Sequence, residues 1–182
     1  MTLEHRYYGV SQPYSNWTTD TMGHLQTSQA LADIAHFIEA RNKEWGKRKW
    51  VIIGCSYPGA LSAWFRYKYP HLSVGAVASS AVVNAVLNFT DFDMQVSTSL
   101  QLSAGCYDLV ANWTNFLQTK MEAGGDDETA VRTAFNAPND MPLDEFMWFV
   151  SDIFTISVQY GNRTNLCAYL AEKAPTATYA DL

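Results

Sequence analysis

Ser56 stands in surroundings that could make it a nucleophile. It follows the apolar run of residues 50–53, has Gly54 two positions before it and precedes a helical pattern. A serine at a sharp turn between a strand and a helix, with small neighbours, is a nucleophile elbow, in which the turn exposes the hydroxyl above the sheet. Pro58 replaces the usual glycine two positions after the serine, but proline fits the first turn of a helix. The pattern predicts nucleophilic catalysis by Ser56, with the Tyr57 backbone N–H at the helix N-terminus as an oxyanion donor.

A base for Ser56 is not expected among these residues. In hydrolases with this elbow, the acid and the histidine follow the serine along the chain. His71 is the one histidine after Ser56, no Asp or Glu lies between them, and His71 is predicted to end the nucleophile's own helix, roughly 20 Å from its start. The histidines before the serine, predicted to be structural or surface residues, are His5, His24 and His36. The alternative to an elbow is a glycine-rich tight turn with an incidental serine.

Two strands and a helix are predicted to hold this turn. The continuous apolar run of residues 50–53 is typical of a strand buried on both faces. Residues 60–69 are helical in composition and end at Pro70, and the small apolar residues 74–78 predict a second strand. A strand, a helix and a strand in this order make a parallel βαβ unit with a right-handed crossover.

An amphipathic helix is predicted before this unit. Residues 4–15 read as a loop leaving a strand, and a helix capped by Thr27 or Ser28 follows them. Asn42 and Gly46 are predicted to end it. Its apolar stripe consists of Leu31, Ile34, Ala35 and Ile38.

Strand-like runs disappear after about residue 84, and this change sets the predicted domain boundary. Helical spacing takes over, interrupted by glycine or proline in residues 124–127 and 138–142. The predicted helices are residues 95–102, 107–121, 128–135 and 143–159. The sequence therefore predicts an α/β core over residues 1–83 and a helical insertion over residues 84–182.

The composition excludes several classes of function. The residues are 48% hydrophobic and 16% charged, as in a folded protein, and the net charge of -6 argues against binding to nucleic acid. No apolar run approaches the roughly 20 residues of a membrane helix, and the N-terminus lacks the residue order of a signal peptide. We therefore expect neither nucleic acid nor a membrane as a partner.

Glycosylation signals and cysteines favour an oxidising compartment. Four N-x-T sequons, more than chance would give, favour a secretory or lysosomal history; they begin at Asn16, Asn88, Asn112 and Asn162. The three cysteines are too far apart for a zinc site, so no metal or other cofactor is expected. In an oxidising compartment Cys106 and Cys167 are expected to pair, with Cα atoms roughly 4.4–6.8 Å apart. Cys55 is then expected to be a small buried hydrophobic residue beside Ser56.

Three blocks of the sequence resemble one family of peptidases. They are EHRYYGVS at residues 4–11, GCSYPGALSAW at residues 54–64, and YPH at residues 69–71 followed by ASSA at residues 78–81. In order and spacing they are similar to blocks of the lysosomal Pro-X carboxypeptidase family, which includes dipeptidyl peptidase II and thymus-specific serine protease. The resemblance covers residues 3–96 well and the helical part more loosely.

The resemblance implies a partial α/β-hydrolase core with a helical cap domain, which is the predicted fold class. In such enzymes a Ser-Asp-His triad cleaves a peptide, and the cap helps to select proline or another small residue at the cleaved bond. The resemblance also implies that the Asp and the His follow the cap and that the loop with the second oxyanion donor precedes residue 1. The full-length form is therefore expected to be a serine exopeptidase acylated at Ser56, and the chain by itself is expected to be inactive.

Two other functions stay open at this point. One is an esterase or lipase with the same elbow, and the other is a truncated protein without catalysis. The residues do not decide whether carboxypeptidase or dipeptidyl-peptidase activity is expected. They also leave open whether the chain forms a homodimer.

Several further residues are candidates near a substrate. Tyr7 and Tyr8 could line the site. Trp148 belongs to an aromatic cluster that forms either a substrate pocket or core, with Phe146, Met147 and Phe149. Glu4 and Arg6 favour a buried charge pair that ties the first loop to the core over a catalytic role.

Overall fold

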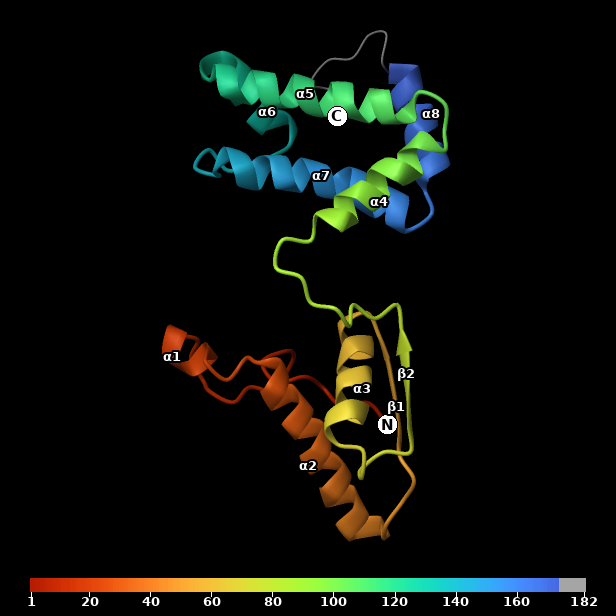
Figure 1. Cartoon of the computed structure of the whole chain (residues 1–182). Coiled ribbons are helices and arrows are strands. Elements are labelled where there is room, and N and C mark those ends of the chain that lie inside the picture. Colours follow the sequence, from red (N-terminus) through yellow and green to blue (C-terminus); the bar gives the residue numbers. More distant parts are fainter. Residues whose placement is uncertain (174–182) are drawn as a thin grey trace. The chain divides into compact units, whose positions relative to one another are not determined.

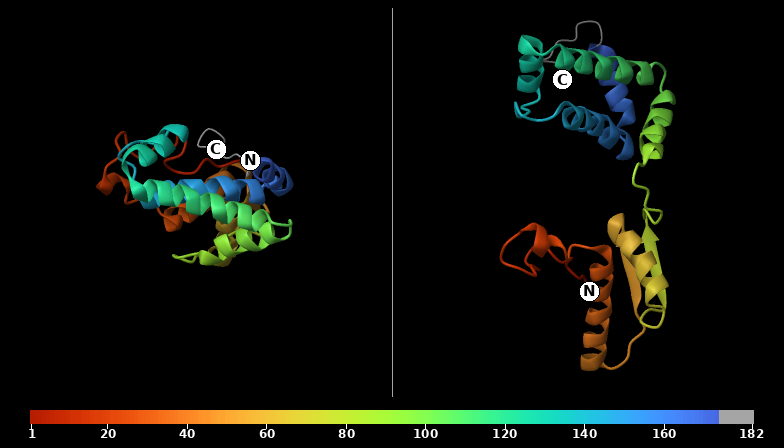
Figure 2. Two further views of the ribbon diagram at one scale, coloured as in Figure 1. Left: turned by 90° about the horizontal axis from the view of Figure 1, so that it is seen from above. Right: turned by 60° about the vertical axis from the view of Figure 1, so that its left-hand side comes forward.

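The computed structural model describes residues 1–173 and divides the chain into two compact units (Figure 1). The first unit spans Met1–Val86, and the second begins at Leu87. Figure 2 shows the elements of each unit from two further sides. None of the described helices is long and apolar enough to cross a membrane.

A parallel two-stranded sheet and the helix that links its strands form the centre of the first unit. Strand β1 is Val51–Cys55, helix α3 is Tyr57–Lys68 and strand β2 is Gly75–Ser79. The two strands pair in parallel along their whole length. The predicted order of strand, helix and strand is present, with each strand starting one residue later than predicted.

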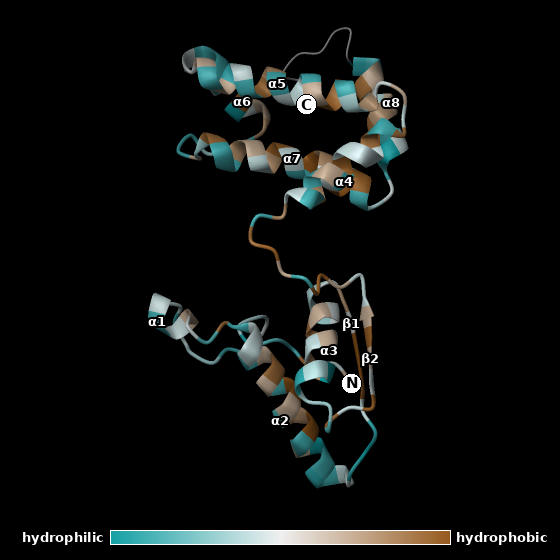
Figure 3. Ribbon diagram, in the orientation of Figure 1, coloured by the Kyte–Doolittle hydropathy of each residue, from teal (hydrophilic) through white to brown (hydrophobic). Residues whose placement is uncertain are grey.

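One face of this sheet packs into a core, whereas the other stays exposed. Helix α2 (Thr27–Trp45) and α3 bury Ala30, Leu31, Ala35, Ile38, Leu61 and Phe65, with Ile52 of β1 packed against them. Along β1, burial alternates, and Val51 and Ile53 are 52% and 74% exposed (Figure 3 shows the strand as hydrophobic). The prediction of a strand buried on both faces is therefore wrong within the described unit, because α2 and α3 pack against one face only.

Helix α2 has the predicted apolar stripe and ends at Gly46 as predicted, but its N-terminal cap differs from the prediction. Its N-cap is Gln26, whose side chain makes no capping hydrogen bond, so the predicted capping by Thr27 or Ser28 is wrong. Asn42 stays inside the helix. Its side-chain oxygen accepts a hydrogen bond of 2.9 Å from Nε1 of Trp50, which ties the helix to the start of β1.

The described part of the second unit consists of helices, and residues 87–173 contain no strand. The helices are α4 (Thr90–Gln101), α5 (Cys106–Ala123), α6 (Gly125–Ala134), α7 (Leu143–Gln159) and α8 (Arg163–Lys173). Their buried core residues are Trp113, Leu117, Met121, Val131, Phe146, Val150, Phe154 and Leu170. The prediction of helices from the apolar spacing in this half of the sequence is therefore confirmed.

Helix α4 begins at Thr90 instead of at the predicted residue 95, and two further features of these helices differ from the prediction. Helix α6 begins at Gly125, inside the segment predicted to be a break, because Asp126, Asp127 and Glu128 lie in its first turn and favour a helix N-terminus. Helix α8 was not predicted at all. A covalent bond attaches it to α5. Its apolar stripe is weak, since Leu170 is its one buried residue.

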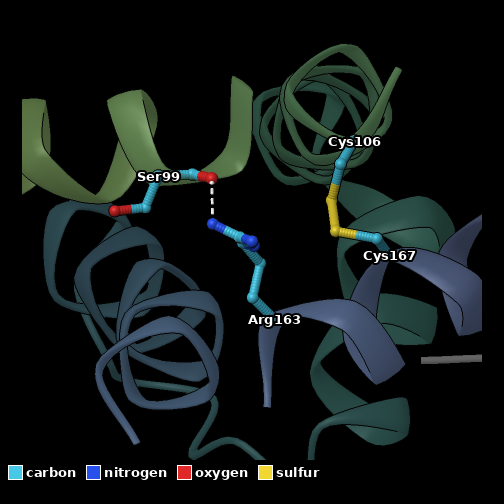
Figure 4. The surroundings of a disulfide bond; sticks show 4 residues. All are labelled: Ser99, Cys106, Arg163 and Cys167. Carbon is cyan, nitrogen blue, oxygen red and sulfur yellow. Dashed lines mark hydrogen bonds between the residues drawn. A yellow bond between two sulfur atoms is a disulfide. The ribbon is translucent and has the colours of Figure 1, made fainter. Parts of the chain in front are cut away.

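That link is a disulfide between α5 and α8. Cys106 and Cys167 are bonded, with Cα atoms 5.2 Å apart, inside the range expected for the pair (Figure 4). Beside the disulfide, Nη1 of Arg163 donates a hydrogen bond of 3.0 Å to the backbone oxygen of Ser99 on α4 (Figure 4). Helix α8 is thus fastened to two other helices of the unit.

Candidate active site

Ser56 forms the turn between β1 and α3. Its φ and ψ angles are 60° and -128°, and it is the N-cap residue of α3. A positive φ is uncommon for a residue other than glycine and stores backbone strain, which is typical of functional sites. The Ser56 N–H donates to the Ser79 backbone oxygen at 3.0 Å, so the turn is held to the end of β2. Ser56 thus occupies a strained strand-to-helix turn, with the strand ending at Cys55 instead of near Ile53.

The Ser56 side chain is exposed at this turn. Its hydroxyl makes no hydrogen bond to another described residue, so the described residues supply no partner that could take its proton. Helix α3 starts at Tyr57, and the first N–H groups of a helix lack an intrahelical acceptor. The Tyr57 N–H is therefore free to bind a carbonyl oxygen beside the Ser56 hydroxyl.

Two glycines allow α3 to approach the strands this closely. A Cβ atom at Gly54 would lie 2.1 Å from the Pro58 backbone oxygen, and a Cβ atom at Gly59 would lie 2.7 Å from the Ser79 backbone oxygen. Pro58 itself lies in the first turn of α3, as predicted. The glycine missing two positions after the serine is thus not needed, because Gly59 makes the close approach to β2.

Replacing Gly54 by alanine is expected to destabilise the first unit by about 1–3 kcal/mol, because the new methyl group meets backbone that cannot move alone. Chemical denaturation of the 182-residue chain measures this cost. The matched control is Gly75→Ala in β2, where no atom lies within 4 Å of the new Cβ, so little change is expected. Equal stability of the two variants would show that α3 does not approach β1 this closely.

The loop that carries the first sequence block is braced at several points. The Glu4 carboxylate accepts a hydrogen bond of 2.8 Å from the Ser11 N–H, and this hydrogen bonding to Ser11 lowers the pKa of Glu4 below its usual value. The brace is present above the usual pKa of Glu4 and is lost as the pH falls through the lowered value. Nε and Nη2 of Arg6 donate to the two carboxylate oxygens of Asp33 at 2.7 and 2.6 Å.

The predicted pairing of Glu4 and Arg6 is therefore corrected. Glu4 closes its own loop, whereas Arg6 binds Asp33 on α2 and its pKa is raised mainly by that hydrogen bonding. Asp33 is not predictable as a partner of Arg6 from local patterns, since an acidic residue beside the apolar stripe of a helix usually faces water. Asp33 lies next to Ile34, which packs against the core, and this position on α2 could have indicated that Asp33 has a partner within the protein.

The two tyrosines of this loop have different roles. Tyr7 is 5% exposed, has a φ of 69°, and its hydroxyl donates to the backbone oxygen of Thr21 in the short helix α1 (Thr19–Met22). The expectation that Tyr7 lines the site is therefore wrong, because its side chain holds the loop to α1. Tyr8 is 59% exposed, and its ring contacts His5 edge-on at 5.0 Å between centroids.

All four histidines belong to the first unit. His71 comes after the end of α3 at Lys68 instead of ending that helix, and its ring contacts Tyr69. His24 stacks on Tyr14, and His36 is exposed on α2. His5 is half-buried and lies beside Tyr57, the residue after Ser56.

Two further sets of candidates are Cys55 in the first unit and the aromatic cluster on α7 in the second. Cys55 is exposed rather than buried, because it lies on the open face of β1 with Val51 and Ile53. On α7, Phe146 belongs to the core, whereas Trp148 is 72% exposed. The described residues contain no group of three or more His, Cys, Asp or Glu side chains that could hold a metal ion.

Each described unit contains a cavity. One of about 570 Å³ is lined by residues of the first loop, α2, β1 and α3, including Arg6 and Leu61. The other, of about 310 Å³, lies between α4, α5 and α7. Neither is lined by Ser56, so neither is assigned to a substrate.

A strained serine at the end of a parallel strand, followed directly by the N-terminus of a helix, has the geometry of a nucleophile elbow. The chain belongs to the serine carboxypeptidase S28 family, whose profile matches residues 1–176. The resemblance drawn from the three sequence blocks is thereby confirmed.

Individual relatives agree with this assignment. The chain is 36% identical over 183 residues to "Probable serine protease EDA2" of Arabidopsis thaliana, covering 94% of this chain and 36% of the relative. It is 34% identical over 145 residues to human thymus-specific serine protease, covering 75% of this chain and 28% of the relative. It is 49% identical over 86 residues to bovine lysosomal Pro-X carboxypeptidase, covering 44% of this chain and 17% of the relative. The chain thus spans about a third or less of the length of these relatives.

Proposed function

We propose that this chain carries the nucleophile of a serine exopeptidase that cleaves peptides near proline through an acyl-enzyme on Ser56. The observation that carries the proposal is the Ser56 turn, with a φ of 60° and an exposed side chain next to the N-terminus of α3. The proline preference is taken over from the relative named lysosomal Pro-X carboxypeptidase.

The proposed reaction has two steps. The Ser56 Oγ adds to the scissile carbonyl carbon, a base takes the hydroxyl proton and passes it to the leaving amine, and an ester forms on Ser56. Water then cleaves the ester, which releases the acid and restores the serine. The Tyr57 N–H stabilises the negative oxygen that forms in both steps. The base and its acid partner are proposed to come from residues outside Met1–Leu182.

The architecture proposed for the enzyme follows the same family. The first unit is proposed to be part of an α/β-hydrolase core, because its strand, helix and strand place the elbow as that fold does. The helical second unit is proposed to be the cap domain, with Trp148 on its exposed surface contacting substrate. Tyr8 is proposed to contact substrate from the first unit.

A lysosomal or secreted location is proposed on three grounds. The disulfide between Cys106 and Cys167 needs an oxidising compartment. The four sequon asparagines, proposed to carry glycans, are all exposed: Asn16, Asn88, Asn112 and Asn162. One relative is named as lysosomal.

The test is covalent labelling of Ser56 in an active chain. In the full-length Arabidopsis relative, the segment that matches residues 1–176 is replaced by residues 1–176 of this chain. The chimaera is then treated with a fluorophosphonate probe and with prolyl peptides. Labelling and turnover are expected and should both vanish on Ser56→Ala.

The matched control is Ser62→Ala on the same helix. Ser62 is buried and donates to the Pro58 backbone oxygen at 2.8 Å, so its loss should leave labelling in place. Labelling that survives Ser56→Ala would overturn the proposal.

A further inference from the structure

The residue after the nucleophile is anchored by its side chain. The Tyr57 hydroxyl lies 3.5 Å from Nε2 of His5 and 3.3 Å from Oγ1 of Thr27 on α2. The His5 and Tyr57 rings are 5.7 Å apart between centroids. Tyr57 is 41% exposed, so burial alone does not fix it.

The direction of these hydrogen bonds follows from the neighbouring contact of His5. Its Nδ1 lies 2.7 Å from the Arg6 backbone oxygen, which can only accept, so Nδ1 must carry a hydrogen. In the neutral ring, Nε2 is then the acceptor, and the Tyr57 hydroxyl donates to it. The Thr27 hydroxyl can in turn donate to the Tyr57 oxygen. The result is one directed chain of hydrogen bonds from Thr27 through Tyr57 and His5 to Arg6.

His5 is itself held in place from both sides along the chain. Glu4 binds the Ser11 N–H, and Arg6 binds Asp33 on α2 through two hydrogen bonds. Thr27 and Asp33 belong to the same helix. The anchor of Tyr57 therefore reaches α2 by two routes, one direct and one through His5.

This anchor acts beside a backbone N–H that the helix leaves without an acceptor. The Tyr57 N–H is the first of α3 and makes no intrahelical hydrogen bond, and Pro58 beside it has no N–H to share the task. The carbonyl of the same peptide group, that of Ser56, accepts a hydrogen bond of 3.0 Å from the Ala60 N–H. The helix therefore holds one side of the group, and the contacts of the Tyr57 side chain anchor the residue on the other. An oxyanion donor displaced by a fraction of an ångström loses much of its effect.

We propose that His5 is a positioning residue that acts through the Tyr57 hydroxyl and aims the Tyr57 N–H at the oxyanion. The proposal rests on the proposed nucleophilic role of Ser56. It gives the conspicuous His-Arg-Tyr-Tyr block of the first loop a task in the reaction: Arg6 and Glu4 hold the loop, and His5 holds Tyr57.

The test is a double-mutant cycle in the active chimaera. His5→Phe keeps a ring beside Tyr8 and removes both nitrogens, and Tyr57→Phe removes only the hydroxyl. Each is expected to lower kcat about tenfold with a smaller change in KM, because the donor acts on the transition state. The double variant should be no worse than the worse single variant. Tyr14→Phe, in the same segment but stacked on His24, is the control and should leave kcat unchanged.

Additive losses, or losses in melting temperature with kcat intact, would overturn the positioning role. In the 182-residue chain, ¹⁵N spectra of His5 should show the Nδ1–H tautomer and a shifted Nε2 signal in Tyr57→Phe. An Nε2–H tautomer, or no response to Tyr57→Phe, would overturn it independently of activity. Failure of the wild-type chimaera to label at Ser56 would instead overturn the proposed function, so the two failures are distinguishable.

Discussion

The 182-residue chain by itself is expected to hydrolyse prolyl peptides about 10⁴-fold or more slowly than the chimaera that restores a full-length context. Losing one member of a serine triad removes most of the rate and leaves only the contribution of the oxyanion hole and of binding. The Ser56 hydroxyl has no hydrogen-bond partner among the described residues, and no Asp or Glu lies between Ser56 and His71. Steady-state assays of both proteins, with the fluorophosphonate probe as a second readout, measure the difference.

The control for this comparison is Ser56→Ala in both proteins. It should abolish turnover in the chimaera and change little in the short chain. An enzyme-like rate of the short chain that Ser56→Ala abolishes would show that one of its four histidines is the base. His5 would then be the first to examine, since it contacts the residue after Ser56.

Removal of the disulfide is expected to destabilise the second unit by up to about 4 kcal/mol. The bond closes a loop of 61 residues, and the loss of chain entropy in the unfolded state grows with loop length. Helix α8 should be affected most, because it has one buried residue and depends on the disulfide and on Arg163 to stay attached. Denaturation of a Cys106→Ala, Cys167→Ala variant, followed by circular dichroism, measures the cost.

The matched control is Cys55→Ala, which removes an exposed free thiol in the other unit. It should leave the denaturation midpoint of the helical unit unchanged. Hydrogen exchange adds a local readout: exchange in α8 should rise first when the disulfide is absent. Equal exchange in α8 and α5 would contradict the view that the bond fastens α8.

The sequence alone determined the elements around Ser56 because their signals are local. A continuous apolar run, a glycine two positions before the serine and a proline in the first helical turn each act on their own backbone or on near neighbours. The same holds for most helices of the second unit, since their apolar spacing directly reports the side that packs. The family could also be recognised at this level, because its blocks are contiguous.

Only the tertiary structure decided which distant groups meet. The pairing of Arg6 with Asp33, 27 positions away, and the contact of His5 with Tyr57, 52 positions away, depend on how the first loop folds onto α2 and α3. Local patterns contain no information on such partners, and they assigned Glu4 and Arg6 to each other. The exposure of Ile53 and Cys55 likewise depends on which face of β1 the helices cover. Propensity and spacing act over a few residues, whereas burial and side-chain pairing are settled only when segments far apart in the sequence come into contact.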